Sequence, residues 1–336
     1  MNQNDVRDFG ATGDGLGDDT QAIQDALDAG GTTLFPAGIY TVRRLTVPSG
    51  AILRGIGGGS FDMPELPASQ FSVLKLLDGA EDHLLYGPPE SQRVIIEDLQ
   101  LDGNRYNQTA TSCGIYLEAG AAPPPPPYTQ EAQWVLRRVY IHDCRTDGLY
   151  IGANRRNNLV DACTFAHNRQ HGINIWGTDC TFRASNGVAN GAYGINVGAA
   201  LTRILGGNLC WNLIGVNVIS QTFGMVLTGA GIDRNYRQGV RLEPGAVEGV
   251  VSSNVFGSNS QEADGVYAHV LVGEGCRAVV CGNAFVALAA GLPYKPSYAV
   301  ELEAGAWATG IEHSALSPNS TSQGLSNARA LDGWWG

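Results

Sequence analysis

A short pattern, glycine followed by an apolar residue, any residue and a second apolar residue, recurs along the middle of the chain. Successive glycines of this pattern are separated by 34, 24, 22, 21, 24 and 26 residues. Short β-rich segments with a period near 22 residues are what one coil, or rung, of a parallel β-helix requires. The pattern begins at Gly114, Gly148, Gly172, Gly194, Gly215, Gly239 and Gly265.

Asparagines follow nearly the same period. A stacked side-chain amide can bond backbone groups of the rungs above and below it, so we expect these residues at one turn of every rung. Leucine-rich repeats share the period but require regular leucines that this chain lacks. The sequence therefore predicts an all-β fold, a single-stranded right-handed parallel β-helix. The asparagine series is Asn168, Asn190, Asn212, Asn235 and Asn259.

We expect residues 1–336 to form a single β-helix domain. Residues 1–45 are predicted to hold an N-terminal cap and the first strands, residues 46–302 the rungs, and residues 303–336 a C-terminal cap. Loop insertions are predicted near 57–70 and 120–130, because the second contains a run of prolines that cannot join a strand ladder. A short capping helix is expected from Asp18-Asp19-Thr20 to about Ala29, with Ile23, Ala26 and Leu27 on one face.

Composition limits the partners. The formal net charge of −11 argues against nucleic acid or an anionic membrane surface as a partner, and no apolar run is long enough to span a bilayer. Seven cysteines without C-x-x-C spacing predict buried free thiols rather than disulfides or a zinc site, and we expect no metal and no cofactor. No signal peptide is visible after Met1, which leaves a cytoplasmic, a phage-borne and a secreted, trimmed protein all open.

Side chains alternate along a strand, so the residue between the two apolar positions of each pattern is expected to point outward. Neighbouring rungs are ~4.8 Å apart, and these outward residues should form a continuous column. A second outward column is expected two residues later, at Glu118, Trp176, Glu243 and His269. A third precedes the glycines, at Asp147, His171, Tyr193, Gln238 and Asp264. The first column is Tyr116, Tyr150, Asn174, Asn196, Asn217, Arg241 and Tyr267.

Aromatic rings stack on the apolar faces of sugars, while amides and carboxylates bond hydroxyl groups. This predicted face therefore favours a carbohydrate substrate. Two other interpretations stay open: an asparagine and tyrosine ladder that only stabilises the stack, and a site for a small molecule or peptide.

The N-terminal segment carries a family resemblance. Asp5-Val-Arg-Asp-Phe-Gly-Ala-Thr-Gly-Asp-Gly, Asp18-Asp19-Thr20 and Phe35-Pro36-Ala37-Gly38-Ile39-Tyr40 resemble the opening of pectate-lyase-superfamily proteins, which include polygalacturonases, mannuronan epimerases and phage tailspikes. The resemblance implies the β-helix fold, whereas the chemistry varies within the superfamily and some members are not enzymes.

One strand resembles family motifs more closely. Gln170-His171-Gly172 is similar to the Gly-His-Gly strand of polygalacturonases and the Arg-His-Gly strand of mannuronan epimerases. This resemblance implies that His171 is an acid/base or substrate-orienting group. The paired-aspartate strand of polygalacturonases is absent, Glu243 stands where their Arg-Ile-Lys strand has lysine, and Gln170 replaces the epimerase arginine. Neither mechanism transfers intact.

Two catalytic groupings follow from the columns. Tyr150, His171 and Tyr193 lie on consecutive rungs and could move a proton at a carbon beside a carboxylate. Glu243 and Asp264 are predicted one rung apart, a spacing that suits a hydrolase. We favour the tyrosine and histidine grouping and expect Arg241 to hold a neighbouring sugar.

The function predicted from the sequence is an enzyme that cleaves or epimerises a polysaccharide or oligosaccharide, as a lyase, glycoside hydrolase or epimerase. A non-catalytic tailspike-like or sugar-binding β-helix is one alternative, and an intracellular tailoring enzyme for a small metabolite is another. A monomer and a homotrimer are both compatible with the resemblance.

Overall fold

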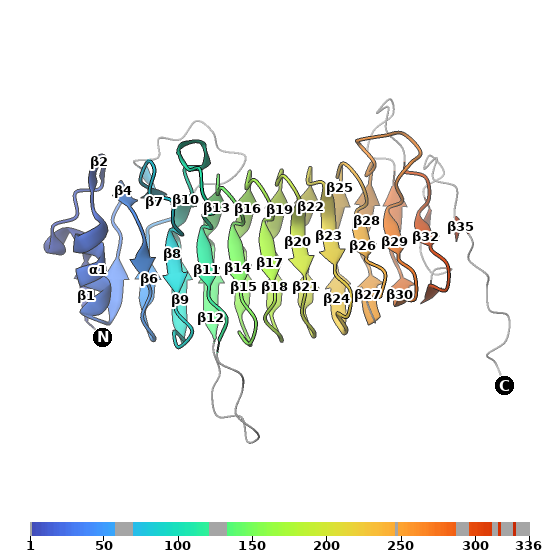
Figure 1. Cartoon of the computed structure of the whole chain (residues 1–336), viewed down its shortest axis with the longest axis horizontal. Helices are drawn as coiled ribbons and strands as arrows, with labels where there is room; N and C mark the ends of the chain where they lie inside the picture. Colours follow the sequence, from blue (N-terminus) through green and yellow to red (C-terminus); the bar gives the residue numbers. More distant parts are fainter. Residues whose placement is uncertain are drawn as a thin grey trace, which may run out of the picture.

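Three parallel sheets wind along the whole chain in the computed structural model, which describes residues 2–57, 70–120, 133–245, 248–286 and 296–310 and the strand pairs 315–316 and 325–326. Each rung contributes one strand to each sheet, and the rungs stack into an elongated body (Figure 1). The predicted parallel β-helix is confirmed. The predicted insertions near 57–70 and 120–130 and most of the predicted C-terminal cap lie outside the described residues.

Sheet A has 12 strands, in the order in which they stack. They are β1 (Gln3–Asp5), β3 (Thr32–Leu34), β6 (Ile52–Arg54), β9 (Val94–Glu97), β12 (Trp134–Arg137), β15 (Leu159–Asp161), β18 (Thr181–Arg183), β21 (Arg203–Leu205), β24 (Met225–Thr228), β27 (Glu248–Ser252), β30 (Arg277–Cys281) and β33 (Trp307–Thr309).

Sheet B also has 12 strands. They are β2 (Asp14–Asp18), β4 (Gly38–Val42), β7 (Ser72–Leu76), β10 (Gln100–Asp102), β13 (Tyr140–His142), β16 (Thr164–Ala166), β19 (Asn186–Val188), β22 (Asn208–Cys210), β25 (Gly231–Asp233), β28 (Val255–Gly257), β31 (Ala284–Val286) and β34 (Ala315–Leu316).

Sheet C has 11 strands and carries the predicted outward columns. They are β5 (Leu45–Thr46), β8 (Leu85–Gly87), β11 (Ile115–Leu117), β14 (Leu149–Ile151), β17 (Ile173–Ile175), β20 (Tyr193–Val197), β23 (Ile214–Val218), β26 (Val240–Leu242), β29 (Val270–Val272), β32 (Val300–Leu302) and β35 (Leu325–Ser326).

The predicted asparagine ladder occupies the corner between sheets B and C. The backbone N–H and the side-chain Nδ2 of Asn190 both donate to Oδ1 of Asn212, each over 3.0 Å, and the same pattern joins the successive asparagines from Asn168 to Asn259. The ladder explains the glycine pattern. A Cβ at Gly148 would lie 2.8 Å from Nδ2 of Asn168 and 2.7 Å from the carbonyl oxygen of Gly172, so only glycine lets the chain pass the ladder.

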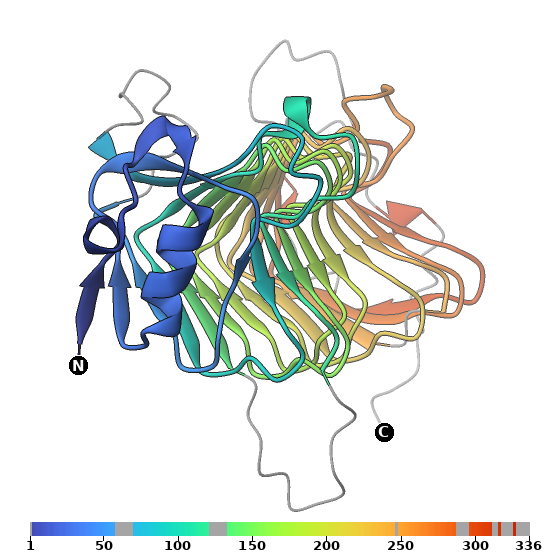
Figure 2. The same cartoon turned by 60° about the vertical axis from the view of Figure 1, so that its left-hand side comes forward.

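The interior of the coil is filled by apolar side chains from all three sheets in one continuous core. The capping helix α1 (Thr20–Asp28) buries Ile23, Ala26 and Leu27, as predicted, and lies at the N-terminal end of the stack (Figure 2). Two short 3-10 segments, η1 (Val6–Phe9) and η3 (Arg105–Asn107), complete the helical elements described. Burial of α1 against the first strands covers a sheet end that would otherwise be free to pair.

All seven cysteines are free thiols, six of them buried and Cys281 partly so, which confirms the sequence prediction. Within the described ranges, no helix combines the length and the apolar character that crossing a bilayer would require.

Candidate functional site

The outward column predicted from the sequence is a continuous row on sheet C. Strand register pairs Tyr116 with Tyr150, Tyr150 with Asn174, and so on through Arg241. The row begins one rung earlier than predicted, because Tyr86 pairs with Tyr116. We call this set the sheet C row: Tyr86, Tyr116, Tyr150, Asn174, Asn196, Asn217 and Arg241.

The first part of the sheet C row is an aromatic stack. The ring of Tyr116 lies parallel to that of Tyr150, with centroids 4.8 Å apart, and parallel to His83, at 4.1 Å. Tyr86 stacks at 6.4 Å and its hydroxyl bonds the carboxylate of Glu118. Rings aligned with the helix axis form a ribbon of π-surface, a shape suited to the flat faces of successive sugars.

The second part of the row is a chain of side-chain hydrogen bonds. Nδ2 of Asn196 donates to Oδ1 of Asn174 over 3.1 Å, and Nδ2 of Asn217 donates to Oδ1 of Asn196 over 2.9 Å. A carboxylate ends the chain on one side, where Asn174 donates to Oδ2 of Asp147 over 2.9 Å. On the other side Nε of Arg241 donates to Oδ1 of Asn217 over 2.7 Å.

This chain corrects part of the predicted binding face. Asn217 is fully buried, and Asn196 and Gln238 are nearly so. These three side chains therefore do not present surface to a ligand, and the two asparagines act as a support beneath more exposed neighbours. Asn174 is half-buried and Trp176 is 40% exposed, so both still reach the surface.

His171, Tyr193 and Arg241 form one contiguous group on this face. The rings of His171 and Tyr193 stack with centroids 4.8 Å apart. Nη2 of Arg241 donates to the hydroxyl oxygen of Tyr193 over 3.1 Å and to Oε1 of Glu243 over 2.7 Å. Arg241 thus extends past the rung of Asn217 to the tyrosine. We call Asp147, His171, Tyr193, Arg241 and Glu243 the polar cluster.

Hydrogen bonds fix the orientation of His171. Its backbone N–H donates to Oδ1 of Asp147 over 3.1 Å, and its Nδ1 accepts from the backbone N–H of Tyr193 over 3.3 Å. A neutral imidazole with Nδ1 as acceptor carries its proton on Nε2. Burial lowers the pKa of His171, against the attraction of Asp147, and this favours the neutral form.

The carboxyl group of Asp147 is almost completely buried. Burial raises its pKa, while His171 and the bond from Asn174 act in the opposite direction. Burial also raises the pKa of Tyr150, with smaller contributions from Tyr116 and Asp147, so Tyr150 is a poor base near neutral pH.

The predictions based on Gly265 are wrong in placement. Gly265 has a φ of +69° in a turn, and the strand begins later, at Val270, so that Leu271 rather than Tyr267 pairs with Arg241. Tyr267 and Asp264 lie in the segment before β29, where Asp264 is exposed. Asp264 therefore does not occupy the column in which it was expected to face Glu243.

His269 is also misassigned by the sequence pattern. It is 1% exposed and packs inside the coil against Phe256 and Phe285, with Nδ1 2.9 Å from Nδ2 of Asn259. Its carbonyl oxygen accepts from Val240, as that of Gly172 accepts from Leu149, so it occupies the glycine position of its rung. A residue at that position points inward.

Sequence reasoning missed Tyr86 and His83. Their rung has no glycine before its apolar pair, so the pattern that located the other rungs does not mark it. Among the residues that the structure describes, no three His, Cys, Asp or Glu side chains gather as a metal ion would require.

A parallel β-helix with an aromatic and polar face along one sheet defines the class of pectate-lyase-like β-helix proteins. The family model described as rhamnogalacturonase A/epimerase, pectate lyase-like matches residues 4–202, and one described as right handed beta helix region matches residues 128–285. The chain therefore belongs to the rhamnogalacturonase A/epimerase, pectate lyase-like family, and the predicted right-handed β-helix is confirmed.

Known relatives agree with this assignment. Mannuronan C5-epimerase AlgE5 of Azotobacter vinelandii is 29% identical over 71% of this chain and 25% of its own length. A capsule K30/K69-specific depolymerase of Klebsiella phage K64-1 is 25% identical over 92% of this chain and 42% of its own length. The A-module of the Azotobacter vinelandii epimerase AlgE6 superposes with a TM-score of 0.67 at 23% identity, over 96% of this chain and 97% of the module. The chain thus spans less than half of either full-length relative.

Proposed function

We propose that this protein binds a polysaccharide along the outer face of sheet C and cleaves or epimerises it by moving a proton at a sugar carbon. The observation that carries the proposal is the contiguous contact of His171, Tyr193 and Arg241 beside an aromatic stack. The epimerase and depolymerase among the relatives support a polysaccharide as the substrate.

Proton removal beside a carboxylate requires a base, an acid and a positive charge near the developing negative charge. Arg241 supplies the cation, and its bond to Tyr193 holds the phenol oxygen beside that charge. Tyr193 is the proposed proton-transfer residue. His171, with its proton on Nε2, is the proposed donor to the sugar. Asp147 is a positioning residue, since it bonds the backbone of His171 and the side chain of Asn174.

Hydrolysis by a carboxylate pair has less support. Glycosidases place the two carboxyl groups roughly 5–9.5 Å apart. Asp147 precedes β14 and Glu243 follows β26, four rungs later, a separation of ~19 Å. Glu243 is also engaged by Arg241 and Asn217. Its proposed role is to orient Arg241 rather than to attack the substrate.

The length of the face favours a polymer over a small metabolite. The sheet C row extends from β8 to β26, six steps of ~4.8 Å. A row of nearly 30 Å can contact several consecutive sugars, of which a small metabolite would use only one position. A uronate polymer is the substrate class that a proton-transfer centre with a nearby arginine would suit.

Solvent exchange tests the proposal directly. Alginate and polygalacturonate are incubated with the protein in D2O, and deuterium at the uronate carbons is followed by NMR together with the ultraviolet absorbance of unsaturated ends. Deuterium uptake without new ends indicates an epimerase, and new unsaturated ends indicate a lyase. New reducing ends without either signal would instead show a hydrolase and contradict the proton-transfer mechanism.

Saccharide binding without chemistry is the second candidate. The observation that favours it is the aromatic stack of His83, Tyr86, Tyr116 and Tyr150, which needs no reacting group to hold a glycan. Retention of a polymer with no exchange and no new ends, across acidic and neutral polysaccharides, would select this function. The mass of the particle in solution decides between the monomer and the homotrimer expected from the sequence.

A further inference from the structure

The corner between sheets B and C carries a second surface feature. After each sheet B strand, one residue adopts a left-handed conformation, and these residues stack from rung to rung. Their side chains differ in size, since the small Ala189 lies between His167 and Trp211. The positive φ angles of this stack are 56° for His167, 53° for Ala189, 56° for Trp211 and 51° for Arg234.

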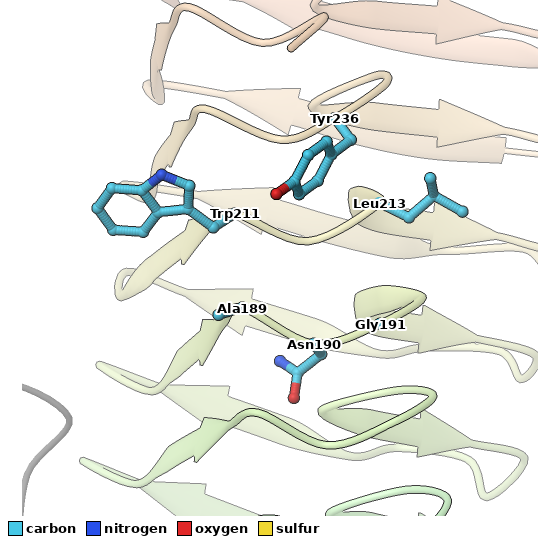
Figure 3. Close-up of a pocket in the computed structure, with 6 residues that line it drawn as sticks. All are labelled: Ala189, Asn190, Gly191, Trp211, Leu213 and Tyr236. Carbon is cyan, nitrogen blue, oxygen red and sulfur yellow. The ribbon is translucent and has the colours of Figure 1, made fainter. Parts of the chain in front are cut away.

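The same rung is also empty two residues further on. Gly191 follows Ala189, whereas the corresponding residues of the next rungs are Leu213 and Tyr236. A Cβ at Gly191 would lie 2.2 Å from the carbonyl oxygen of Arg169, so no larger residue fits there. The missing side chains leave an open depression of about 580 Å3, bounded by Trp211, Leu213 and Tyr236 (Figure 3).

Two aromatic rings stand at the wall of this depression. Trp211 is 40% exposed and Tyr236 is 49% exposed, and they project from neighbouring rungs (Figure 3). The guanidinium carbon of Arg234 lies 5.0 Å from the centroid of the Trp211 ring, and its Nη1 is 2.8 Å from Oδ2 of Asp233. The cation and its carboxylate partner hold the indole in place and add polar groups beside it.

We propose that this depression is a second saccharide-binding site, which holds one or two sugar units of a glycan against Trp211 and Tyr236. Its volume lies within the range of about 300–1,000 Å3 that is typical of small-ligand sites. Rings flanked by a guanidinium and a carboxylate match a sugar, which has apolar faces and a rim of hydroxyl groups.

The site includes no residue of the sheet C row or of the polar cluster. A protein partner would need a complementary surface of about 800 Å2 on each side, far more than a dent one rung wide. A saccharide therefore fits the depression better than a second copy of this chain does.

Three single variants test the site. Trp211→Ala and Tyr236→Ala each remove one ring. Ala189→His fills the dent and leaves both rings in place, and the left-handed backbone tolerates it because His167 already occupies that position one rung earlier. Phe223→Ala is the matched control, since Phe223 is 50% exposed but does not line the depression.

Affinity electrophoresis through gels that contain alginate, polygalacturonate or a neutral glucan measures binding. We expect each of the three corner variants to weaken binding to at least one polymer by about tenfold, as loss of a central aromatic contact does, and Phe223→Ala to bind like the wild type. Equal retardation of the wild type and all variants, or no retardation of the wild type by any polymer, overturns the proposal.

Sedimentation of the same proteins separates the other occupant from a glycan. If the corner variants lower the mass of the particle instead of its polymer affinity, the depression is a contact between copies and the saccharide site is rejected. The result is independent of the proposed reaction, because a chain that shows no deuterium exchange can still lose polymer binding on replacement of Trp211.

Discussion

The guanidinium of Arg241 donates to the hydroxyl of Tyr193 over 3.1 Å, although the rung of Asn217 lies between their strands. The contact exists because Nε of Arg241 is held by Asn217 and its Nη2 is shared between Tyr193 and Glu243. A planar fork with several fixed donors makes these three bonds at once, whereas an ammonium group of lysine cannot reproduce their geometry.

Arg241→Lys is therefore expected to lower kcat on the processed polymer by about tenfold or more, since the cation is retained but no longer placed at Tyr193. Steady-state kinetics on the polymer identified by deuterium exchange measure the effect. Arg237→Lys is the control, because Arg237 forms an ion pair with the exposed Glu262 and does not touch Tyr193. Equal activity of the two variants would show that the fork of Arg241 has no part in the reaction.

The two tyrosines of the predicted catalytic grouping should separate by function. Tyr193→Phe removes the hydroxyl that Arg241 holds, and we expect kcat to fall by about a hundredfold or more, as loss of a general acid or base does. Tyr150→Phe keeps the stack with Tyr116, and the raised pKa of Tyr150 makes its hydroxyl a poor base, so kcat should change little. Tyr150→Ala should raise KM because one ring of the stack is lost. Inactivation by Tyr150→Phe with Tyr193→Phe still active would assign the proton transfer to Tyr150.

Most of the architecture follows from the sequence because the glycine pattern has a physical cause. The asparagine ladder leaves no room for a Cβ at Gly148, so the pattern marks each rung that passes the ladder in this way. The pattern fails where glycine serves another purpose. At Gly265 it supports a turn, and the strand that follows begins at Val270.

The site was less predictable than the fold. Strand alternation places Asn217 outward, but its burial depends on Tyr193, Arg241 and Glu243 packing and bonding around it, which no local pattern encodes. The reach of Arg241 to Tyr193 likewise depends on side-chain length across two rungs. Roles of the individual residues remain predictions that the variants above test.

The buried asparagine ladder should contribute strongly to stability without touching the polar cluster. In Asn212, Oδ1 accepts from the backbone and side chain of Asn190, and Nδ2 donates to the carbonyl of Gly187 and to Asn235. Asn212→Ala leaves buried donors and acceptors unpaired, and we expect the free energy of unfolding to fall by about 3 kcal/mol. The shift in the urea midpoint measures it. The exposed Asn208 provides the control, for which Asn208→Ala should cost less than about 0.5 kcal/mol. Equal midpoints would mean that the ladder contributes nothing net.

His269 should make the protein sensitive to acid. Burial lowers its pKa from the ordinary 6.5 to about 3, so between these values the unfolded chain binds a proton that the folded chain does not. Stability is therefore complete above about pH 6.5 and declines as the pH falls toward 3, by up to ~1.4 kcal/mol per pH unit. His269→Gln removes the titrating group and keeps an acceptor for Nδ2 of Asn259. Urea unfolding at several pH values should show a shallower decline for His269→Gln than for the wild type. Phe256→Leu, which alters a neighbouring ring without changing charge, should shift stability by the same amount at every pH. Parallel curves for the wild type and His269→Gln would contradict the assignment, because a neutral buried imidazole must resist protonation in the folded state alone.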